Sequence, residues 1–368
     1  MDVKGMRISG SRVLIVVSLV FVMLISSSSS RAEGTVIAGV NIVAGVYQPT
    51  TARASDGRTA VQLLKGMHTN YVMRGFFKWG PSPPAQYIVL KSSVAQLKAA
   101  IPSLIYGGGI AAQYLVRQDT WANGGKISDP DFQKMLARDA SGNPIAAYDG
   151  FLPDLASSAY RDYLIGWSKK QVDAGVGAIF FDGVYVYAQY KTQYMGKRWT
   201  DTLTEYGGYF ASVTANVKAY AASKGRQLFI TMNNQRAVDI ATWPAASVTM
   251  EDFVSVTFSA ADFQAPFSLT EDWAKIKSAI TSKFGHEVLI VAFIDWSSNE
   301  DTAMHRFGTL STANQINLIR QLDSATRSAG ILFAYPVYGG NVDSQTKYDS
   351  VKYGTYDTIV SLAKSASS

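Results

Sequence analysis

The pattern that most constrains the fold is an alternation of short apolar runs with longer amphipathic stretches. The runs are rich in Val, Ile, Phe and Gly, as strands buried on both faces are. We identify eight runs: Thr35–Ile42, Tyr71–Trp79, Leu104–Ala111, Ala178–Gly183, Leu228–Met232, Ser247–Glu251, Val288–Ile294 and Ile331–Tyr335. The expected helices are Gly57–Met67, Val94–Ala100, Tyr160–Asp173, Thr202–Lys224, Glu271–Lys283, Ser311–Ser328 and Tyr348–Lys364. Eight strand–helix units predict an α/β fold, a single (β/α)8 TIM barrel. An open doubly wound sheet is the alternative, although the chain has no glycine-rich phosphate turn.

The first 32 residues have the layout of an export signal. Three basic residues precede the apolar run Val13–Ile25, and serines follow it. This run is short for a membrane span, which needs about 20 residues. We expect a secretory signal peptide at residues 1–32, followed by one barrel domain at residues 33–368. The expected location is secreted or extracellular, with an uncleaved anchor at the cell surface as the alternative.

Composition argues against several classes of partner. The formal net charge is +6, and residues 1–32 hold four basic groups and one acidic group. Removing that +3 leaves +3, which is too small and too scattered to indicate nucleic-acid binding. The three histidines, His68, His286 and His305, are far apart, and the sequence contains no cysteine. We therefore expect no metal site of the zinc type and no cofactor.

Carboxylates follow three of the expected strands, and one of them is Asp295 after Val288–Ile294. The run Ala178–Phe181 ends in Asp182 and Gly183, and a charge at the end of a buried run is costly unless it is used. The sixth expected strand ends in Glu251 and Asp252. Active sites of these barrels lie at the carboxyl ends of the strands, and alternate strands contribute to the same layer of inward side chains. Asp182 and Glu251 are therefore expected to face one substrate.

Two carboxyl groups flanking a glycosidic bond are the requirement for its hydrolysis. We expect Asp182 to be the nucleophile or base and Glu251 to be the general acid, with Asp252 as the alternative acid. Aromatic rings, amides and charges at the same mouth are suited to sugars, because rings pack on sugar faces and polar groups bind hydroxyls. The expected substrate-binding residues are Arg74, Lys78, Trp79, Gln113, Trp121, Asp154, Tyr185, Asn233, Asn234, Asp252, Asp295, Trp296 and Tyr335.

The stretch "LPDLASSAYRDYLIGWSKKQVDAGVGAIFFDGV", residues 152–184, resembles (β/α)8 glycoside hydrolases of the endo-α-1,4-polygalactosaminidase type and their relatives. The preceding "ARDASGNPIAAYDG", residues 137–150, is similar to the substrate loop of such enzymes. In that type an Asp ends strand four and a Glu ends strand six, which the resemblance places at Asp182 and Glu251. The resemblance implies a sugar polymer but does not identify the sugar.

These observations together predict a secreted, endo-acting glycoside hydrolase that acts on a polysaccharide or oligosaccharide. The alternative is a cell-surface carbohydrate-binding protein that uses the barrel as a scaffold without turnover.

Overall fold

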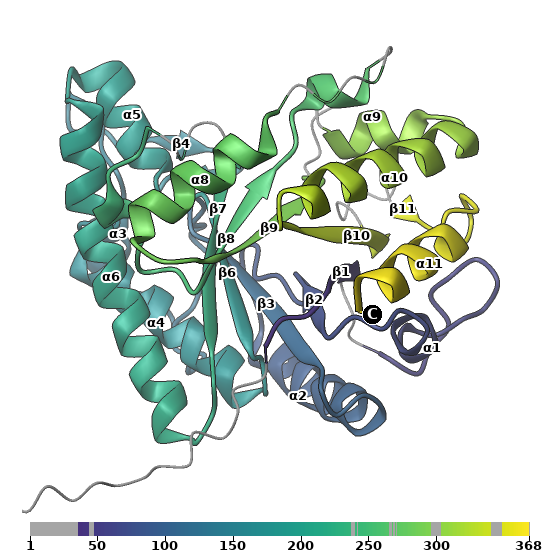
Figure 1. The fold of residues 1–368 in the computed structure, drawn as a ribbon. Helices are drawn as coiled ribbons and strands as arrows, with labels where there is room; N and C mark the ends of the chain where they lie inside the picture. The colour runs from purple at the N-terminus through teal and green to yellow at the C-terminus, as the bar shows by residue number, and fades with distance from the viewer. Residues whose placement is uncertain are drawn as a thin grey trace, which may run out of the picture. The chain divides into compact units, whose positions relative to one another are not determined.

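The chain folds into a closed barrel of parallel strands surrounded by helices (Figure 1). The computed structural model describes residues 36–43, 48–236, 240, 242–264, 267, 269, 271–295, 303–339 and 348–367. Eight strands pair in parallel in the order β1-β2-β3-β6-β7-β8-β9-β10, and β1 pairs with β10. This closure confirms the predicted (β/α)8 barrel and excludes the open sheet. The barrel strands are β1 Val40–Val43, β2 Tyr71–Met73, β3 Ile105–Ala111, β6 Ala178–Asp182, β7 Phe229–Arg236, β8 Phe253–Thr257, β9 Leu289–Phe293 and β10 Leu332–Gly339.

Helices follow most of the strands, as the sequence predicts. The helices are α1 Ala60–Lys65, α2 Pro84–Ala100, α3 Asp129–Met135, α4 Ser158–Asp173, α5 Val186–Met195, α6 Trp199–Ser223, α8 Trp273–Phe284, α9 Ala303–Thr309, α10 Thr312–Ser328 and α11 Tyr356–Ser367, with 3-10 turns η1 Ala245–Ser247 and η2 Ala260–Phe263. The short strand β11 Tyr348–Asp349 pairs antiparallel with β10, where the sequence predicts helix. No helix among the described residues has both the length and the apolar character to span a membrane. The expected signal peptide, residues 1–32, lies outside the described residues.

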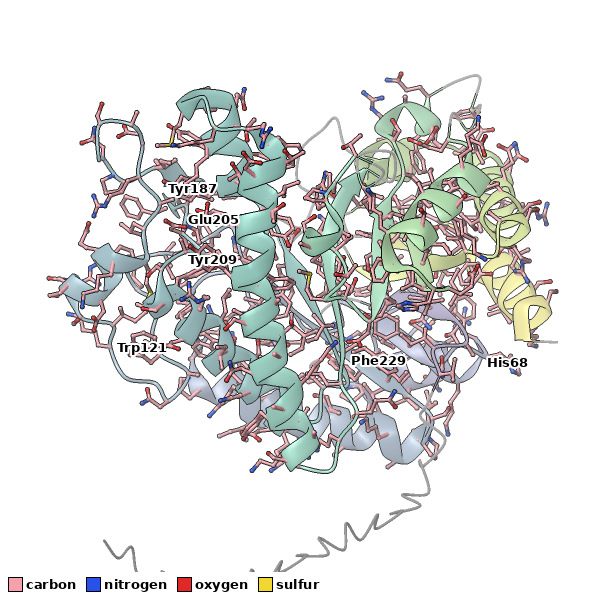
Figure 2. The ribbon with its side chains drawn as sticks, turned by 60° about the vertical axis from the view of Figure 1, so that its left-hand side comes forward. His68, Trp121, Tyr187, Glu205, Tyr209 and Phe229 are labelled. Carbon is pink, nitrogen blue, oxygen red and sulfur yellow. The ribbon has the colours of Figure 1, made fainter. Side chains whose placement is uncertain are left out.

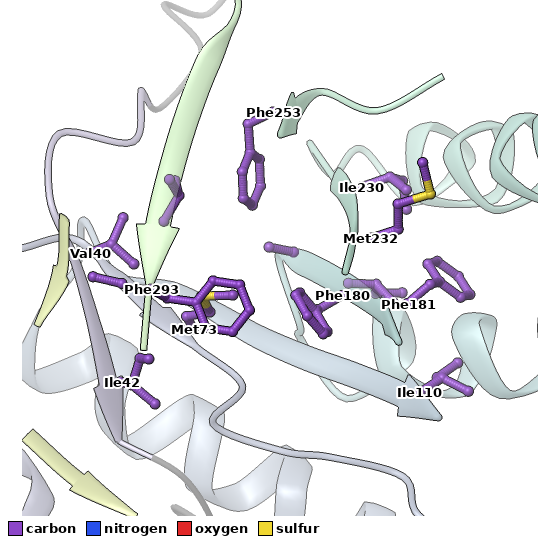
Figure 3. Packing of buried hydrophobic residues seen from close by; sticks show 14 of the residues in the cluster. Val40, Ile42, Met73, Ile110, Phe180, Phe181, Ile230, Met232, Phe253 and Phe293 are labelled. Carbon is purple, nitrogen blue, oxygen red and sulfur yellow. The ribbon is translucent and has the colours of Figure 1, made fainter. Parts of the chain in front are cut away.

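The barrel interior is filled by stacked layers of side chains from facing strands (Figure 3). Tyr71 meets Phe253 edge-on with ring centroids 5.6 Å apart, and Phe180 meets Phe293 at 5.8 Å. A glycine in β3 makes room for this packing, because a Cβ on Gly109 would lie 2.4 Å from the ring of Phe77. Each large apolar side chain buried in this way stabilises the fold by about 1.5–3 kcal/mol.

A long excursion separates β3, which ends at Ala111, from α4, which begins at Ser158. It contains α3 and a two-stranded hairpin, β4 Ala146–Ala147 and β5 Gly150–Phe151. The hairpin is fixed to the chain that leaves β3, since Leu115 and Phe151 exchange backbone hydrogen bonds of 2.9 and 3.0 Å. The excursion therefore stands at the carboxyl ends of the barrel strands, which we call the rim.

The sixth barrel strand is not the expected one. The segment Ala245–Ser247 forms the turn η1, and the strand is β8, which begins at Phe253 and ends at Thr257. Its five residues pair one to one with β9, from Phe253 with Leu289 to Thr257 with Phe293. The strand that the sequence analysis expected to end in a carboxylate therefore ends in a threonine.

Candidate active site

Asp182 is the last residue of β6, and two amide side chains hold its carboxylate at the rim. Asn233 of β7 donates from Nδ2 to Oδ1 at 2.9 Å, and Gln113 donates from Nε2 to Oδ2 at 3.2 Å. The next residue must be glycine, because Gly183 has φ 68° and a Cβ there would lie 2.4 Å from Gln113 Oε1. Side chains alternate along a strand, so Asp182 faces the barrel interior as Phe180 does.

The two amides hold this carboxylate at a cost. Gln113 Oε1 and Asn233 Oδ1 are buried, and neither accepts a hydrogen bond from the part of the chain that the structure describes. A buried acceptor without a partner costs about 1–3 kcal/mol. Two such costs beside one carboxylate indicate an arrangement that serves the position of Asp182 rather than the stability of the fold.

Arg74 and Asp295 form a charged pair on the same rim. Arg74 directly follows β2, and its Nη1 lies 3.6 Å from Oδ1 of Asp295, two residues beyond β9. The guanidinium lies over the rings of Phe77 and Phe180, at 4.7 and 5.3 Å from their centroids. Arg74 has φ 56°, a left-handed conformation that costs a side-chain-bearing residue on the order of 1–2 kcal/mol. Such strain is typical of functional sites.

Three aromatic side chains, Trp79, Tyr114 and Tyr148, form what we call the aromatic ledge. The ring of Trp79 stacks on Tyr114 with centroids 5.0 Å apart and meets Tyr148 edge-on at 5.1 Å. The exposed fraction is 43% for Trp79 and 71% for Tyr148. The pKa of Tyr148 is raised, first by burial around its hydroxyl, then by the charge of Asp182, with a smaller effect from Asp295. The ledge and both carboxylates therefore belong to one mouth.

Glu251 has hydrogen-bond partners within the fold. It is buried in the barrel wall, where Oε2 accepts from the backbone N–H of Met232 at 2.8 Å and from a threonine hydroxyl of β7. Asp252 accepts from the N–H of Ile230 at 2.7 Å and forms an ion pair with Lys218 of α6 at 2.8 Å. The prediction that these residues end a strand is wrong, because the chain enters β8 at this point. Both carboxylates instead fix the start of β8 against β7.

Lys78 and Trp121 also have internal partners. The ammonium of Lys78 is buried, 3.0 Å from Asp119 and 2.6 Å from the hydroxyl of Tyr163. Burial lowers the pKa of Lys78, and the charge of Asp119 opposes that effect. Trp121 packs edge-on against Tyr163 at 6.4 Å, and Figure 2 shows it well below Tyr187, which lies just beyond β6. These contacts pin the excursion to the barrel and do not support the predicted substrate-binding role of either residue.

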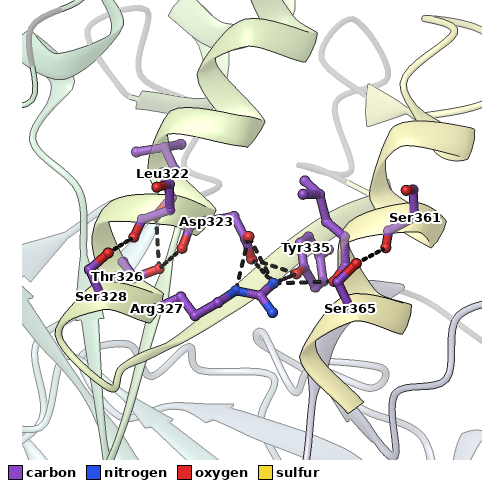
Figure 4. Close-up of polar contacts among 10 residues, drawn as sticks. Leu322, Asp323, Thr326, Arg327, Ser328, Tyr335, Ser361 and Ser365 are labelled. Carbon is purple, nitrogen blue, oxygen red and sulfur yellow. Dashed lines mark hydrogen bonds and ion pairs between the residues drawn. The ribbon is translucent and has the colours of Figure 1, made fainter. Parts of the chain in front are cut away.

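Tyr335 points into the helix layer and not into the mouth (Figure 4). Its hydroxyl donates to Asp323 of α10 at 2.6 Å. Arg327 pairs with Asp323 at 2.8 Å and donates to the carbonyl of Leu362 in α11 at 3.1 Å. The predicted substrate contact of Tyr335 is therefore corrected to a structural one, which joins β10, α10 and α11.

Asp154 and Tyr185 are likewise occupied within the fold. Asp154 accepts from the hydroxyl of Tyr206 in α6 at 2.6 Å, and burial raises the pKa of that tyrosine. Tyr185 is buried and donates to the carbonyl of Ser247 at 2.6 Å. Both predicted binding residues thus have structural partners within the fold.

Two predicted binding residues stay predictions. Trp296 lies outside the described residues, and for Asn234 the structure describes the backbone within β7 but not the side chain. Within the described ranges, no group of three or more His, Asp or Glu side chains is placed to hold a metal ion.

Tyr148 is a rim residue that was missed in the sequence, whereas Tyr114 directly follows Gln113 after the third expected strand. A signal for Tyr148 exists in "AAYDGF", residues 146–151, where a bulky aromatic occupies the tip of a tight hairpin that usually carries Asn or Gly.

The fold and the rim define the class of this chain, a (β/α)8-barrel protein with a carboxylate and aromatic mouth. No protein-family model and no curated protein matches its sequence. Among solved structures it is similar to Amy13B of Eubacterium rectale, at 11% identity over 89% of this chain and 79% of that chain, with a TM-score of 0.52. At this identity the likeness shows the barrel fold alone.

Two further solved structures are similar at lower TM-scores. The glycoside hydrolase domain of PelA from Pseudomonas aeruginosa is 14% identical over 82% of this chain and 96% of that chain, with a TM-score of 0.47. Ega3 of Aspergillus fumigatus, in complex with galactosamine, is 13% identical over 86% of this chain and 98% of that chain, with a TM-score of 0.43.

Proposed function

We propose that this protein is a glycoside hydrolase that uses Asp182 and Asp295 as its two carboxyl groups. One observation carries the proposal: a carboxylate at the end of a barrel strand is held by Gln113 and Asn233 beside an aromatic ledge that is open to solvent. Carboxyl ends of barrel strands are where the chemistry of this fold takes place. The resemblance of residues 152–184 to polysaccharide-active enzymes supports the same class of reaction.

The chemistry follows from two carboxyl groups on either side of a glycosidic bond. Asp182 acts on the anomeric carbon, either by direct attack or by taking a proton from the water that attacks. Asp295 gives a proton to the leaving glycosidic oxygen, so that the C–O bond breaks and one water is added overall. This role requires that bound substrate separate Asp295 from Arg74, because a neighbouring cation disfavours the protonated carboxyl. We assign this second role to β9 because β8 ends in Thr257, which has no carboxyl group.

We further propose that the enzyme is exported and cleaves within polysaccharide chains. Export is supported by the basic and apolar pattern of residues 1–32. Endo action is supported by the exposure of the ledge, which leaves a polymer free to extend past the rim. Amino-terminal sequencing of protein recovered from the culture medium tests export, and the early appearance of oligosaccharides of several lengths tests endo action.

A second candidate function is carbohydrate binding without turnover. It is favoured by the place of Glu251 in the barrel wall and by Thr257 at the end of β8, since neither supplies an acid at the mouth. This function keeps the aromatic ledge but needs no proton donor.

One experiment separates the two functions. Soluble xylan, β-glucan, galactomannan, pullulan, dextran, polygalacturonate and chitosan are incubated with the purified chain, and both reducing-end release and retardation in polysaccharide-containing gels are measured. Release from one polymer supports hydrolysis. Retardation without release supports binding alone, and neither effect with any polymer contradicts both functions.

A further inference from the structure

We infer that Tyr148 forms a sugar-binding subsite with Trp79, on the side of the rim where Gln113 holds Asp182. The inference rests on the proposed function and adds to it the place where a pyranose ring stacks. It assigns a role to a tyrosine that is neither a carboxylate nor a part of the barrel.

The first argument is the shape and exposure of the aromatic ledge. Tyr148 is the most exposed of its members at 71%, and Trp79 follows at 43%, whereas Tyr114 is buried beneath them. Trp79 lies nearly parallel to Tyr114, with an interplanar angle of 18°, while Tyr148 stands at 73° to Trp79. The two exposed rings thus form a corner, and a corner of aromatic faces suits a sugar ring with an apolar side.

The second argument is backbone strain at the tip of the hairpin. Tyr148 has φ 56°, which is an outlier for a bulky residue. The hairpin holds it there, because Asp149 accepts from the hydroxyl of Tyr114 and Gly150 packs so closely that a Cβ would lie 2.6 Å from the carbonyl oxygen of Leu115. A strained aromatic that is mostly exposed gains little from packing, so the strain points to function.

The third observation is the place of the ledge beside the carboxylate. Tyr148 meets Tyr114 edge-on, with ring centroids 5.8 Å apart. Gln113, the neighbour of Tyr114 in the chain, donates from Nε2 to Asp182 Oδ2 at 3.2 Å. A sugar ring that stacks on Tyr148 and Trp79 therefore lies on the side of the rim where Asp182 is held.

The test separates the ring of Tyr148 from its hydroxyl in the full chain. Tyr148→Ala and Trp79→Ala are each expected to weaken retardation by the polysaccharides named above by about 10-fold, because a stacking face is lost. Tyr148→Phe keeps the stacking ring and is expected to keep that affinity. The matched control is Tyr194→Ala on α5, a tyrosine of similar exposure at 62%, which is expected to leave the affinity unchanged.

Tyr148→Gly distinguishes a functional role from a structural one. Glycine relieves the strain at φ 56°, so the melting temperature is expected to hold or rise while affinity falls. A lower melting temperature with unchanged affinity overturns the subsite, and so does a Tyr148→Phe chain that loses as much affinity as Tyr148→Ala.

The proposed function can fail separately. A wild-type chain that binds a polymer without cleaving it contradicts hydrolysis, while the affinities of the variants still decide the subsite. A wild-type chain that binds none of the polymers overturns both proposals.

Discussion

A carboxylate at the rim of the barrel and a carboxylate in its wall have different kinds of hydrogen-bond partners. At the rim, Asp182 is held by two side-chain amides whose oxygens are left buried and unpaired within the described structure. In the wall, Glu251 accepts from the backbone of β7, where its carboxylate completes the hydrogen bonding of a strand. A carboxylate near a strand end can therefore serve either function or stability, and its hydrogen-bond partners tell the two roles apart.

The largest effect is expected for Asp182→Asn. Hydrolysis should fall by about 10²–10⁴-fold or more, since a charged group that acts on the reacting carbon or on water is lost. Stability should not fall, because Gln113 can turn its unpaired oxygen toward the new amide. Reducing-end release and thermal melting measure the two quantities. Retained activity would falsify the assignment of the rim as the active site.

Asp295→Asn tests the second carboxyl group. Activity on polysaccharide should fall by about 10²–10⁴-fold. Most of the loss should be recovered on an aryl glycoside with a good leaving group, because that oxygen departs without a proton. Asp252→Asn serves as a control from the start of β8 and should leave both rates near wild type. A loss of equal size on both substrates contradicts a proton-donor role for Asp295.

Glu251→Ala should act on stability instead. Loss of hydrogen bonds from backbone and hydroxyl donors to a buried carboxylate should lower the free energy of unfolding by about 1.5–3 kcal/mol. Activity per folded molecule should stay within a few fold of wild type. Glu251→Gln keeps one acceptor oxygen and should lose less stability. If either variant is fully stable but inactive, Glu251 is the acid and the contrast between rim and wall fails.

The smallest effect concerns Tyr185, which packs beside Glu251. Burial, and secondarily the charge of Glu251, raises the pKa of Tyr185 well above its ordinary value. A raised folded-state pKa means that the stabilisation is intact below pH 10 and is lost as pH rises above it. Between pH 8 and pH 11, the free energy of unfolding should therefore fall by about 1.4 kcal/mol less in Tyr185→Phe than in the wild type. Urea unfolding at pH 8 and pH 11 measures this difference in free energy. An equal fall in the variant and in the wild type contradicts the prediction.

The barrel could be predicted from the sequence because its signal is local and repeated. Each strand is a short apolar run, and each helix has its own period. Asp182 could be predicted for the same reason, since a charge directly after Phe180 and Phe181 marks a strand end. To predict this carboxylate, only its own strand had to be identified.

The prediction for the partner carboxylate failed because two apolar runs flank that residue. Ser247–Met250 and Phe253–Phe258 lie on either side of Glu251 and Asp252, and the first was taken as the strand. The second is the strand, in keeping with its β-branched Val254, Val256 and Thr257. Which side of a charge holds the strand depends on pairing with β7 and β9, and no local pattern contains that information.

The prediction that Lys78 binds substrate failed for a related reason. A cation after an apolar run resembles a rim residue, yet its partner Asp119 lies on the distant excursion. Side-chain pairs of this kind are fixed by tertiary packing, which spacing along the chain does not encode.

The pairing of β1 with β10 has a consequence for how the chain reaches its fold. Val40 lies opposite Ala334, so the two ends of the folded segment must meet before the barrel is closed. Contacts of such long sequence separation form late and slow the search for the native state. During synthesis, the last strand must leave the ribosome before the first can gain its second neighbour. Until then both edges of the sheet stay open and can pair with other chains.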